Sequence, residues 1–194
     1  MSETHTEARA ATRDLVAAID PLDDTEARHR AQVLDWIDSG APLWRTAKPA
    51  TPPMHLVSYA VVIDPAVEHA LLVDHRLAGL WLPTGGHIEP GEHPTTTARR
   101  ELAEELGIHP DPHHAFGDQP VLVTVTETVG DVTTHHDVSL WYAFTTPTDT
   151  EIRPDRGEFA DTCWWPIEQI THGPGTRFDP HLPRFLAKLV GGAA

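Results

Sequence analysis

The sequence predicts an α+β fold in which a mixed β-sheet lies between layers of helices, preceded by a helical extension. Short segments rich in β-branched and other apolar residues recur from residue 55 to residue 167, which is the pattern of strands. One helical segment, at 94–106, falls between these strands, and another, at 180–190, follows them. This order of elements predicts a mixed sheet with helical layers.

Residues 1–50 differ in pattern from the rest of the chain. Apolar side chains recur there at helical spacing in two runs, near 15–19 and 33–37. A Pro-rich linker, "KPATPPMH", follows. We therefore expect a two-helix extension over 1–50 and a main domain over 51–194.

Two details of the extension can be predicted. Asp24 or Thr25 is available to cap the second helix, because short polar side chains accept hydrogen bonds from the first N–H groups. Trp36 and Trp44 are expected to pack the extension onto the main domain, since large aromatic side chains usually belong to a core.

The main domain is expected to contain several short strands. Their predicted ranges are 55–64, 69–76, 79–84, 120–130, 137–146 and 161–167. After the third strand, Gly85-Gly86 is expected to form a tight turn whose carbonyls can point at a metal. Gly130-Asp131 is expected in a loop that also holds His135 and His136.

Composition excludes several classes of protein. The chain has 14 Lys and Arg against 29 Asp and Glu, a net charge of −15, so no basic surface for a nucleic acid polymer is expected. No apolar run approaches the length of a membrane span, and the N-terminus lacks the pattern of a secretory signal. Cys163 is the only cysteine, which excludes an internal disulfide. We expect a cytoplasmic protein with Cys163 as a small core residue.

Three glutamates crowd one arc of the helix at 94–106. Glu101 is an i,i+3 neighbour of Glu104 and an i,i+4 neighbour of Glu105, and each like-charge pair costs about 0.2–0.5 kcal/mol in an isolated helix. Hard divalent cations prefer several oxygen ligands, so a bound cation would explain the crowding. Arg100 can hold a carboxylate through parallel hydrogen bonds and keep it ionised. A solvated acidic face is the simpler alternative for the glutamates alone.

The spacing of residues 86–108 resembles the Nudix box of MutT-like Nudix hydrolases. The matching positions are Gly86, Glu92, Arg100, Glu101, Leu102, Glu104, Glu105, Gly107 and Ile108. A pattern of this length is far more specific than a short motif. The resemblance covers roughly residues 55–170 and leaves the first fifty residues outside it.

The resemblance implies a Nudix-type α/β/α sandwich and Mg²⁺ or Mn²⁺ as the cofactor. Carried over by position, Glu101, Glu104 and Glu105 would ligate the metal, together with a backbone carbonyl near Gly85. The implied reaction is hydrolysis of a phosphoanhydride in a nucleoside diphosphate that is linked to another moiety. The substrate would be a small molecule such as a nucleoside triphosphate, an oxidised nucleotide or ADP-ribose.

The resemblance also implies catalytic roles. Arg100 would orient Glu101, and Glu92 would tie the loop to the helix. Glu101 or Glu104 is expected to act as the general base, with Glu158 as the alternative from outside the box. The metal ions would neutralise charge in the transition state, which resolves the problem of an acidic protein with an anionic substrate.

Side chains outside the box are weaker candidates for substrate binding. Arg76 is expected to reach a phosphate or to form a surface salt bridge, and His87 to contact the substrate. Four aromatic residues could stack on a base, although packing in the core is the better expectation for each. They are Trp81, Tyr142, Trp164 and Trp165.

The paired histidines raise the question of a zinc site. His135-His136-Asp137 and His113-His114 lack the spacing of zinc motifs, and adjacent residues on a strand point in opposite directions. We expect these histidines to lie exposed in loops.

Two other readings of the fold remain open. A nucleotide-binding sensor without catalysis would be expected to lack box glutamates, and an isoprenoid diphosphate isomerase would need a cysteine before the box. A calcium-binding loop would show a different acidic spacing. The extension is expected to cap the pocket, shield a sheet edge or build a homodimer.

Overall fold

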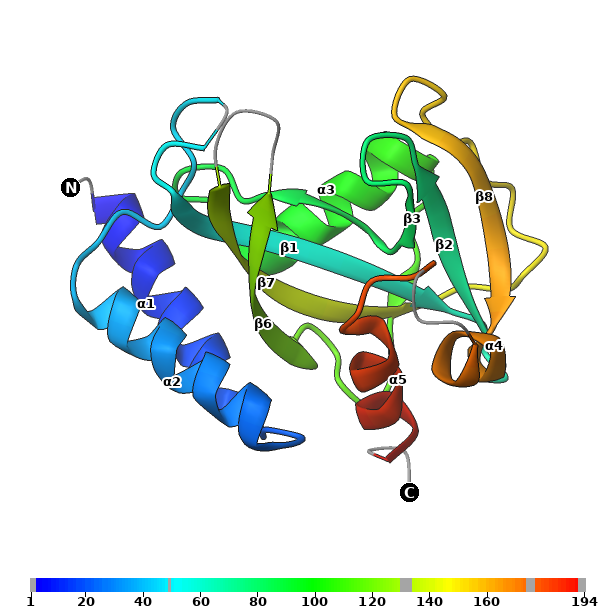
Figure 1. Cartoon of the computed structure of the whole chain (residues 1–194), viewed down its shortest axis with the longest axis horizontal. Coiled ribbons are helices and arrows are strands. Elements are labelled where there is room, and N and C mark those ends of the chain that lie inside the picture. Colours follow the sequence, from blue (N-terminus) through cyan, green and yellow to red (C-terminus); the bar gives the residue numbers. More distant parts are fainter. Residues whose placement is uncertain (1–2, 49, 130–133, 174–176, 192–194) are drawn as a thin grey trace.

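The computed structural model describes residues 3–48, 50–129, 134–173 and 177–191. An eight-stranded mixed sheet lies between helical layers, and two N-terminal helices precede it (Figure 1). The helices are α1 (Glu3–Ala18), α2 (Asp24–Asp38), α3 (Pro94–Leu106), α4 (Ile167–His172) and α5 (Leu182–Gly191). The strands are β1 (Met54–Ile63), β2 (His69–His75), β3 (Leu80–Leu82), β4 (Thr84–His87), β5 (Asp111–Pro112), β6 (Leu122–Val129), β7 (Thr134–Thr145) and β8 (Phe159–Pro166). The predicted fold class is confirmed.

The centre of the sheet is the parallel pair of β1 and β7. Their register runs from Met54 opposite His136 to Ile63 opposite Thr145. On the other side of β1 lie β4 and β2, both antiparallel to it, and β3 and β8 pair with β2. On the other side of β7 lie β6 and β5.

Alternation along the two central strands gives the sheet two apolar faces. Leu56, Ala60 and Val62 of β1 join the core beneath α2 and α3, whereas Val61 and Ile63 join the core beneath α4 and α5. A strand buried on both faces presents successive side chains to opposite layers. The sheet is therefore the middle layer of a sandwich.

Helix α2 covers an edge of this sheet. Strand β6 pairs only with β7 among the described strands, and the N–H groups of Val123 and Val125 are bound by side chains of α2. Val123 N donates to Glu26 Oε1 at 3.4 Å and Val125 N donates to His29 Nδ1 at 3.3 Å. Of the three roles expected for the extension, the structure shows the shielding of a sheet edge.

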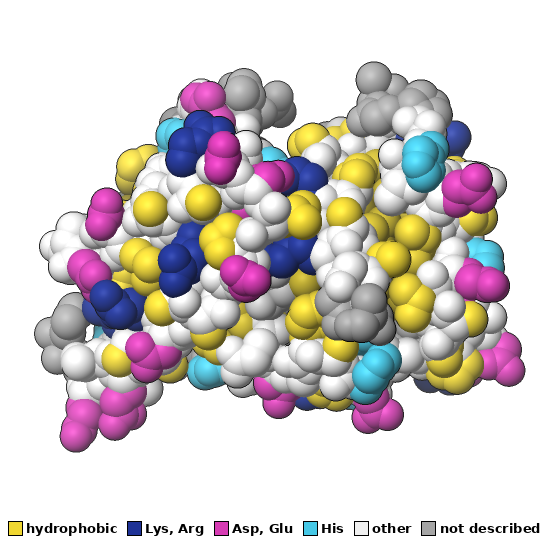
Figure 2. All heavy atoms as spheres, turned by 90° about the horizontal axis from the view of Figure 1, so that it is seen from below, with side chains coloured by type: hydrophobic (Ala, Val, Ile, Leu, Met, Phe, Trp, Pro, Cys, Tyr) yellow, Lys and Arg dark blue, Asp and Glu magenta, His cyan; other side chains and the backbone are white. Residues whose placement is uncertain are grey.

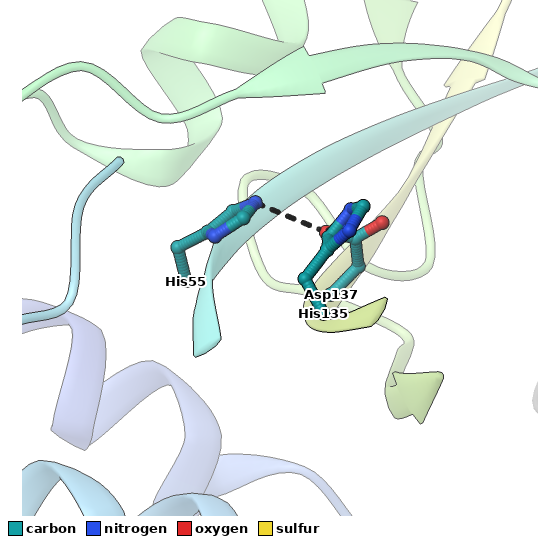
Figure 3. A group of neighbouring side chains, drawn as sticks. All are labelled: His55, His135 and Asp137. Atoms are coloured by element: carbon teal, nitrogen blue, oxygen red, sulfur yellow. Dashed lines mark ion pairs between the residues drawn. The ribbon is translucent and has the colours of Figure 1, made fainter. Parts of the chain in front are cut away.

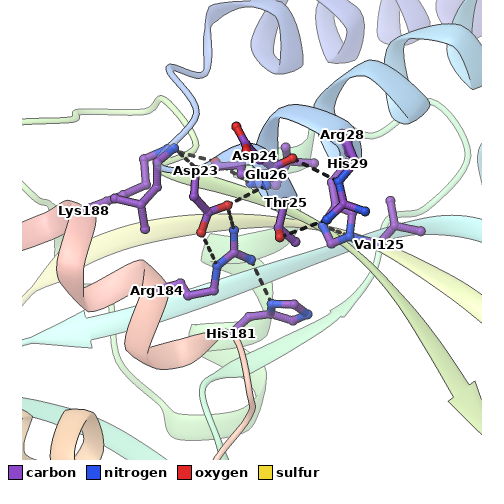
Figure 4. Close-up of polar contacts among 12 residues, drawn as sticks. Asp23, Asp24, Thr25, Glu26, Arg28, His29, Val125, His181, Arg184 and Lys188 are labelled. Atoms are coloured by element: carbon purple, nitrogen blue, oxygen red, sulfur yellow. Dashed lines mark hydrogen bonds and ion pairs between the residues drawn. The ribbon is translucent and has the colours of Figure 1, made fainter.

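Ion pairs fix α2 to the C-terminal helix α5 (Figure 4). The Nζ of Lys188 lies 2.9 Å from Glu26 Oε1, and Glu26 is fully buried. Arg184 donates to both carboxylate oxygens of Asp23, at 2.6 and 3.1 Å. Lys188 also donates to the carbonyl of Asp20 at 2.7 Å. Helices α2 and α5 are thus joined by buried and half-buried charges.

The cap of α2 differs from the prediction. Asp23, and neither Asp24 nor Thr25, is the N-cap residue, and its side chain accepts a hydrogen bond from Glu26 N at 2.9 Å. Asp23 has extended backbone angles, which place its carboxylate over the first turn. Trp44 is buried and Trp36 packs at the edge of the same core, as expected.

The glycine pair does not form the predicted turn. Gly85 and Gly86 lie within β4, opposite Tyr59 and Ser58 of β1. A Cβ on Gly85 would meet the Tyr59 ring, and it would lie 2.5 Å from the carbonyl oxygen of Ser58. Glycine is required here by close approach rather than by chain reversal.

Three expectations for histidine and cysteine were also wrong. His135 and His136 belong to β7 rather than to a loop, because the strand begins at Thr134. His113 is buried rather than exposed, and its ring packs against Phe116. Cys163 is exposed, because β8 is bonded only to β2 on the described part of the sheet. The expected loop at Gly130-Asp131 lies outside the described residues.

Among the described residues, no helix combines the length and the apolar character needed to span a membrane.

Candidate active site

Helix α3 carries the glutamates and is fixed at both ends. His93 precedes it and accepts a hydrogen bond from Thr95 N at 3.3 Å, and Pro94 opens the first turn. Gly107 ends the helix with a left-handed φ of 68°. Ala98, Leu102 and Leu106 are fully buried, so the arc next to them is turned toward β4 and the glycine pair.

Arg100 holds the carboxylates around it. Its NH1 lies 2.8 Å from Glu101 Oε1 and 3.1 Å from Glu104 Oε2, and its other nitrogens bind Glu92 at 3.3 Å. Glu92 also accepts from the Thr97 hydroxyl at 2.7 Å, which ties the loop to the helix. Burial raises the pKa of Glu92, but the hydrogen bonds from Arg100 and Thr97 outweigh it and leave the pKa lowered.

Five carboxylates line one cavity of about 350 Å³: Glu89, Glu101, Glu105, Asp137 and Glu158. Glu101 and Glu105 come from α3, and Glu158 comes from the loop before β8. Burial, together with the charges of Glu101 and Glu158, raises the pKa of Glu105 to about 9. Burial also raises the pKa of Glu101, although Arg100 opposes the shift. Both pKa values are thus raised because the carboxylates are buried close together, an arrangement that a bound divalent cation would stabilise.

Gly86 leaves room for one of these carboxylates. A Cβ on Gly86 would collide with Oε1 of Glu101 and would lie 2.5 Å from its Cδ. The Gly85 backbone forms a hydrogen bond to Glu105. Gly85 and Gly86 thus let a strand pass directly against the carboxylates.

The carboxylates fit the divalent cation that the box implies. Glu105 Oε2 is buried and has no hydrogen-bond partner among the described residues. A buried acceptor in this state costs free energy, and a hard cation with oxygen ligands would satisfy it. Glu101, Glu105 and the Gly85 backbone therefore form a suitable donor set.

Two predicted residues lie outside this cavity. Glu104 is exposed on the solvent side of Arg100, and it is absent from the side chains that line the cavity. Arg76 is also exposed, and it contacts Glu158 only through the backbone, its N–H donating to the Glu158 carbonyl at 3.1 Å. Neither side chain reaches the group formed by Glu101, Glu105 and Glu158.

His87, in contrast, lines the cavity. Burial, together with the charges of Arg45 and His55, lowers its pKa to about 4. The ring is therefore neutral near pH 7, and its Nε2 lies 3.1 Å from Nε2 of His55.

Arg45 and Tyr59 are among the lining residues that were missed from the sequence. Arg45 lies in the segment that follows α2, before the main domain, and still lines the cavity. Tyr59 of β1 is the aromatic side chain in the described lining. No motif marks either residue, because sheet pairing and the path of the linker bring them to the site.

The predicted aromatic candidates lie elsewhere. Tyr142 is buried in the core under α3. Trp164 and Trp165 pack on opposite faces of the sheet, as alternation predicted. Trp81 packs edge to face against Trp165, with ring centroids 5.2 Å apart.

The comparisons with known proteins agree with this geometry. The sequence model of the NUDIX domain matches residues 54–189, which is most of the chain and begins after α2. The chain belongs to the Nudix hydrolase family, a family of pyrophosphohydrolases.

Individual relatives are similar over part of their length. The NAD-capped RNA hydrolase ndx-9 of Caenorhabditis elegans is 40% identical over 75 residues, which cover 38% of this chain and 20% of that protein. The MutT protein of Methanosarcina mazei Go1 superposes with a TM-score of 0.57 at 20% identity, covering 73% of this chain and 96% of that one. An Ap4A hydrolase of C. elegans gives a TM-score of 0.54 at 16% identity over 70% and 95% of the two chains. The structural matches establish the fold.

Proposed function

We propose that this chain is a divalent-metal-dependent pyrophosphohydrolase that cleaves a phosphoanhydride in a nucleoside diphosphate linked to another moiety. The observation that carries the proposal is the convergence of Glu101, Glu105 and Glu158 on one cavity beside Gly85 and Gly86. Its volume, about 350 Å³, is within the range of small-molecule sites.

We assign the metal to Glu101, Glu105 and the carbonyl of Gly85, with Mg²⁺ or Mn²⁺ as the cofactor. The bound cation supplies positive charge that neutralises the phosphates as the anhydride breaks. Arg100 fixes the rotamer of Glu101 through its contact at 2.8 Å and keeps that carboxylate ionised. Glu104 binds the same guanidinium at the outer rim of the site and so helps to fix the position of Arg100.

Arg45 and His87 are proposed to position the substrate. Both side chains line the cavity. Arg45 comes from the segment after α2, so its guanidinium is separate from that of Arg100 on α3. Guanidinium groups bind phosphate through paired hydrogen bonds. Arg76 is less suited to this role because its side chain lies outside the lining.

Glu158 is proposed as the general base. A base must have a lone pair directed at the attacking water. Glu101 is bound by Arg100, whereas Glu158 is half exposed at the cavity and contacts His75 Nε2 at 3.3 Å. The proposal thus favours the residue outside the box over Glu101 and Glu104.

A panel of nucleotides tests the proposal in the presence and absence of Mg²⁺. The panel contains nucleoside triphosphates, an oxidised nucleotide, ADP-ribose, dinucleoside polyphosphates and NAD. We expect Mg²⁺-dependent release of products from at least one compound. Glu105→Gln should lower kcat by on the order of 100-fold or more, because it removes a charged metal ligand.

Further variants separate the roles. Glu158→Gln should lower kcat without weakening Mg²⁺ binding. Glu104→Gln should lower kcat less than Glu158→Gln does. No turnover with any compound, combined with tight binding of one of them, would favour a sensor over an enzyme. Equal activity in the parent and in Glu105→Gln would refute the assigned site.

A single nucleotide fits this protein better than a nucleic acid polymer. On the face seen in Figure 2, the Lys and Arg side chains are interspersed with Asp and Glu and form no continuous basic surface. A polymer that contacts many phosphates requires such a surface.

A further inference from the structure

A second group of potential metal ligands borders the active-site cavity. His55 of β1 faces His135 and Asp137 of β7, and the three residues offer ligand atoms that all lie within 4.8 Å of one another (Figure 3). Asp137 also lines the cavity, so the group borders the active site. It lies on strands β1 and β7, whereas Glu101 and Glu105 lie on helix α3. The group has two imidazoles and one carboxylate, which is a donor set typical of zinc.

The backbone places these residues precisely enough for ligation. In the parallel pairing of β1 and β7, His55 is the register partner of Asp137. His135 and Asp137 are two residues apart on β7, so they project from the same face of the strand. Ligands built on central strands are held more rigidly than ligands on loops.

A hydrogen bond fixes the tautomer of His55. Its Nδ1 lies 2.9 Å from the carbonyl oxygen of Pro52, and a carbonyl can only accept, so Nδ1 carries the hydrogen. In the neutral ring, Nε2 is then left with a lone pair that faces the group. Metal-binding histidines commonly donate their other N–H to a backbone carbonyl in this way.

That lone pair lies close to a carboxylate oxygen and to a ring nitrogen of a second histidine. His55 Nε2 lies 3.1 Å from Asp137 Oδ1, and His135 Nε2 lies 3.5 Å from the same oxygen. His87 Nε2, on β4, is 3.1 Å from His55 Nε2. Hydrogens on the ring nitrogens would satisfy these contacts pair by pair, whereas one cation would be shared by His55, His135 and Asp137 together.

Two of the three separations between ligand atoms match those of a coordination sphere, and the third lies within 4.8 Å. With bonds of about 2.0–2.1 Å, a tetrahedral zinc ion holds its ligand atoms ~3.3 Å apart. The measured separations of 3.1 and 3.5 Å bracket that value. His55 is fully buried and the His135 side chain is 15% exposed, so the group is also largely shielded from water.

We propose that His55, His135 and Asp137 form a second metal centre, of the zinc-binding type, distinct from the carboxylate site on α3. His87 stands beside it as a neighbouring nitrogen donor. The centre joins β1 to β7 at the rim of the cavity.

Titration with Co²⁺, a spectroscopic substitute for zinc, tests this proposal. The full chain is used without a histidine tag and after treatment with a chelator. We expect the intense visible absorption of tetrahedral Co²⁺ to saturate at a single equivalent, whatever Co²⁺ the carboxylates of α3 also bind, and Zn²⁺ to displace it. His135→Ala and Asp137→Asn should each weaken binding by at least ~100-fold, since losing even an outer partner of a metal ligand costs 10–100-fold.

Two variants serve as matched controls. His136→Ala removes the exposed histidine between the two ligands, on the other face of β7, and should leave Co²⁺ affinity unchanged. Glu105→Gln alters the α3 site and should likewise preserve the spectrum. Circular dichroism checks that each variant is folded, and the partly exposed His135 is chosen because His55 is wholly buried.

Three results would overturn the proposal. They are the absence of saturable binding in the parent, binding that survives in folded His135→Ala, and binding that Glu105→Gln abolishes. The first would assign His55 and Asp137 to a protonated ion pair. The last would assign the metal to the glutamates. Because the readout is metal binding, failure here leaves the proposed hydrolysis untouched.

Discussion

Lys188→Met is expected to destabilise the protein strongly. The substitution keeps an unbranched apolar stem but removes the ammonium group that lies 2.9 Å from Glu26. Glu26 is fully buried, and its carboxylate also accepts hydrogen bonds from the N–H groups of Leu22 at 2.7 Å and Val123 at 3.4 Å. Removing one partner of a buried ion pair costs about 3–5 kcal/mol, because the remaining charge stays buried without compensation.

The size of the effect makes it measurable. For a chain of this length, each kcal/mol shifts Tm by about 2–4 °C, so the melting point should fall by roughly 6–20 °C. Urea unfolding followed by tryptophan fluorescence gives the free energy directly, since Trp44 is buried in the core that contains the extension. Arg153→Met is the control: it breaks a solvent-exposed pair with Glu151, and it should shift the melting point far less than Lys188→Met does.

A double variant tests the reason as well as the size. Adding Glu26→Gln to Lys188→Met removes the unpaired charge, so the double variant should be more stable than Lys188→Met by about 1–3 kcal/mol. A loss below about 1 kcal/mol in Lys188→Met, or no recovery in the double variant, would refute the argument that a buried charge pair fixes the extension.

Three further predictions concern the site and its supports. Gly86→Ala should lower hydrolysis by on the order of 100-fold with little change in Tm, because the new Cβ displaces the Glu101 carboxylate; Gly191→Ala, whose Cβ meets nothing, is the control. Mg²⁺ at 100 times its Kd should stabilise the protein by about 2.7 kcal/mol in a thermal melt, and an unchanged response in Glu105→Gln would contradict the assigned ligands. Stability should fall as the pH drops from about 6.5 to about 4, because burial lowers the pKa of His181 to about 4 and also lowers that of His29. These two histidines bind protons in that pH window in the unfolded chain but not in the folded chain. In a variant with glutamine at both positions, the urea midpoint should depend less on pH across the window. A pH dependence equal to that of the parent would disprove the assignment.

The helix that carries the glutamates could be predicted from the sequence almost residue by residue. Its start at Pro94 and its end at Gly107 follow from local chemistry, since one residue lacks an N–H and the other adopts a left-handed φ. The apolar stripe then determines which face is buried. Local signals of this kind need no knowledge of the rest of the fold.

Other parts of the site depend on contacts between distant segments. The environment of His55 is set by register with Asp137, 82 positions away along the chain, and no local spacing reveals it. Gly85 and Gly86 read as a turn because glycine is permissive, whereas their real constraint is the approach of Tyr59 and Glu101. The difference in exposure between Glu105 and Glu104 likewise depends on where β4 crosses α3.

The covering of β6 has a consequence for solubility. The N–H groups of Val123 and Val125 point away from the sheet, and side chains of Glu26 and His29 occupy them. A chain that began at residue 51 would keep the catalytic helix but expose these groups as an open strand edge. Open edges invite pairing with other molecules, so such a shortened protein should aggregate through β6 even though every residue of the active-site motif is intact.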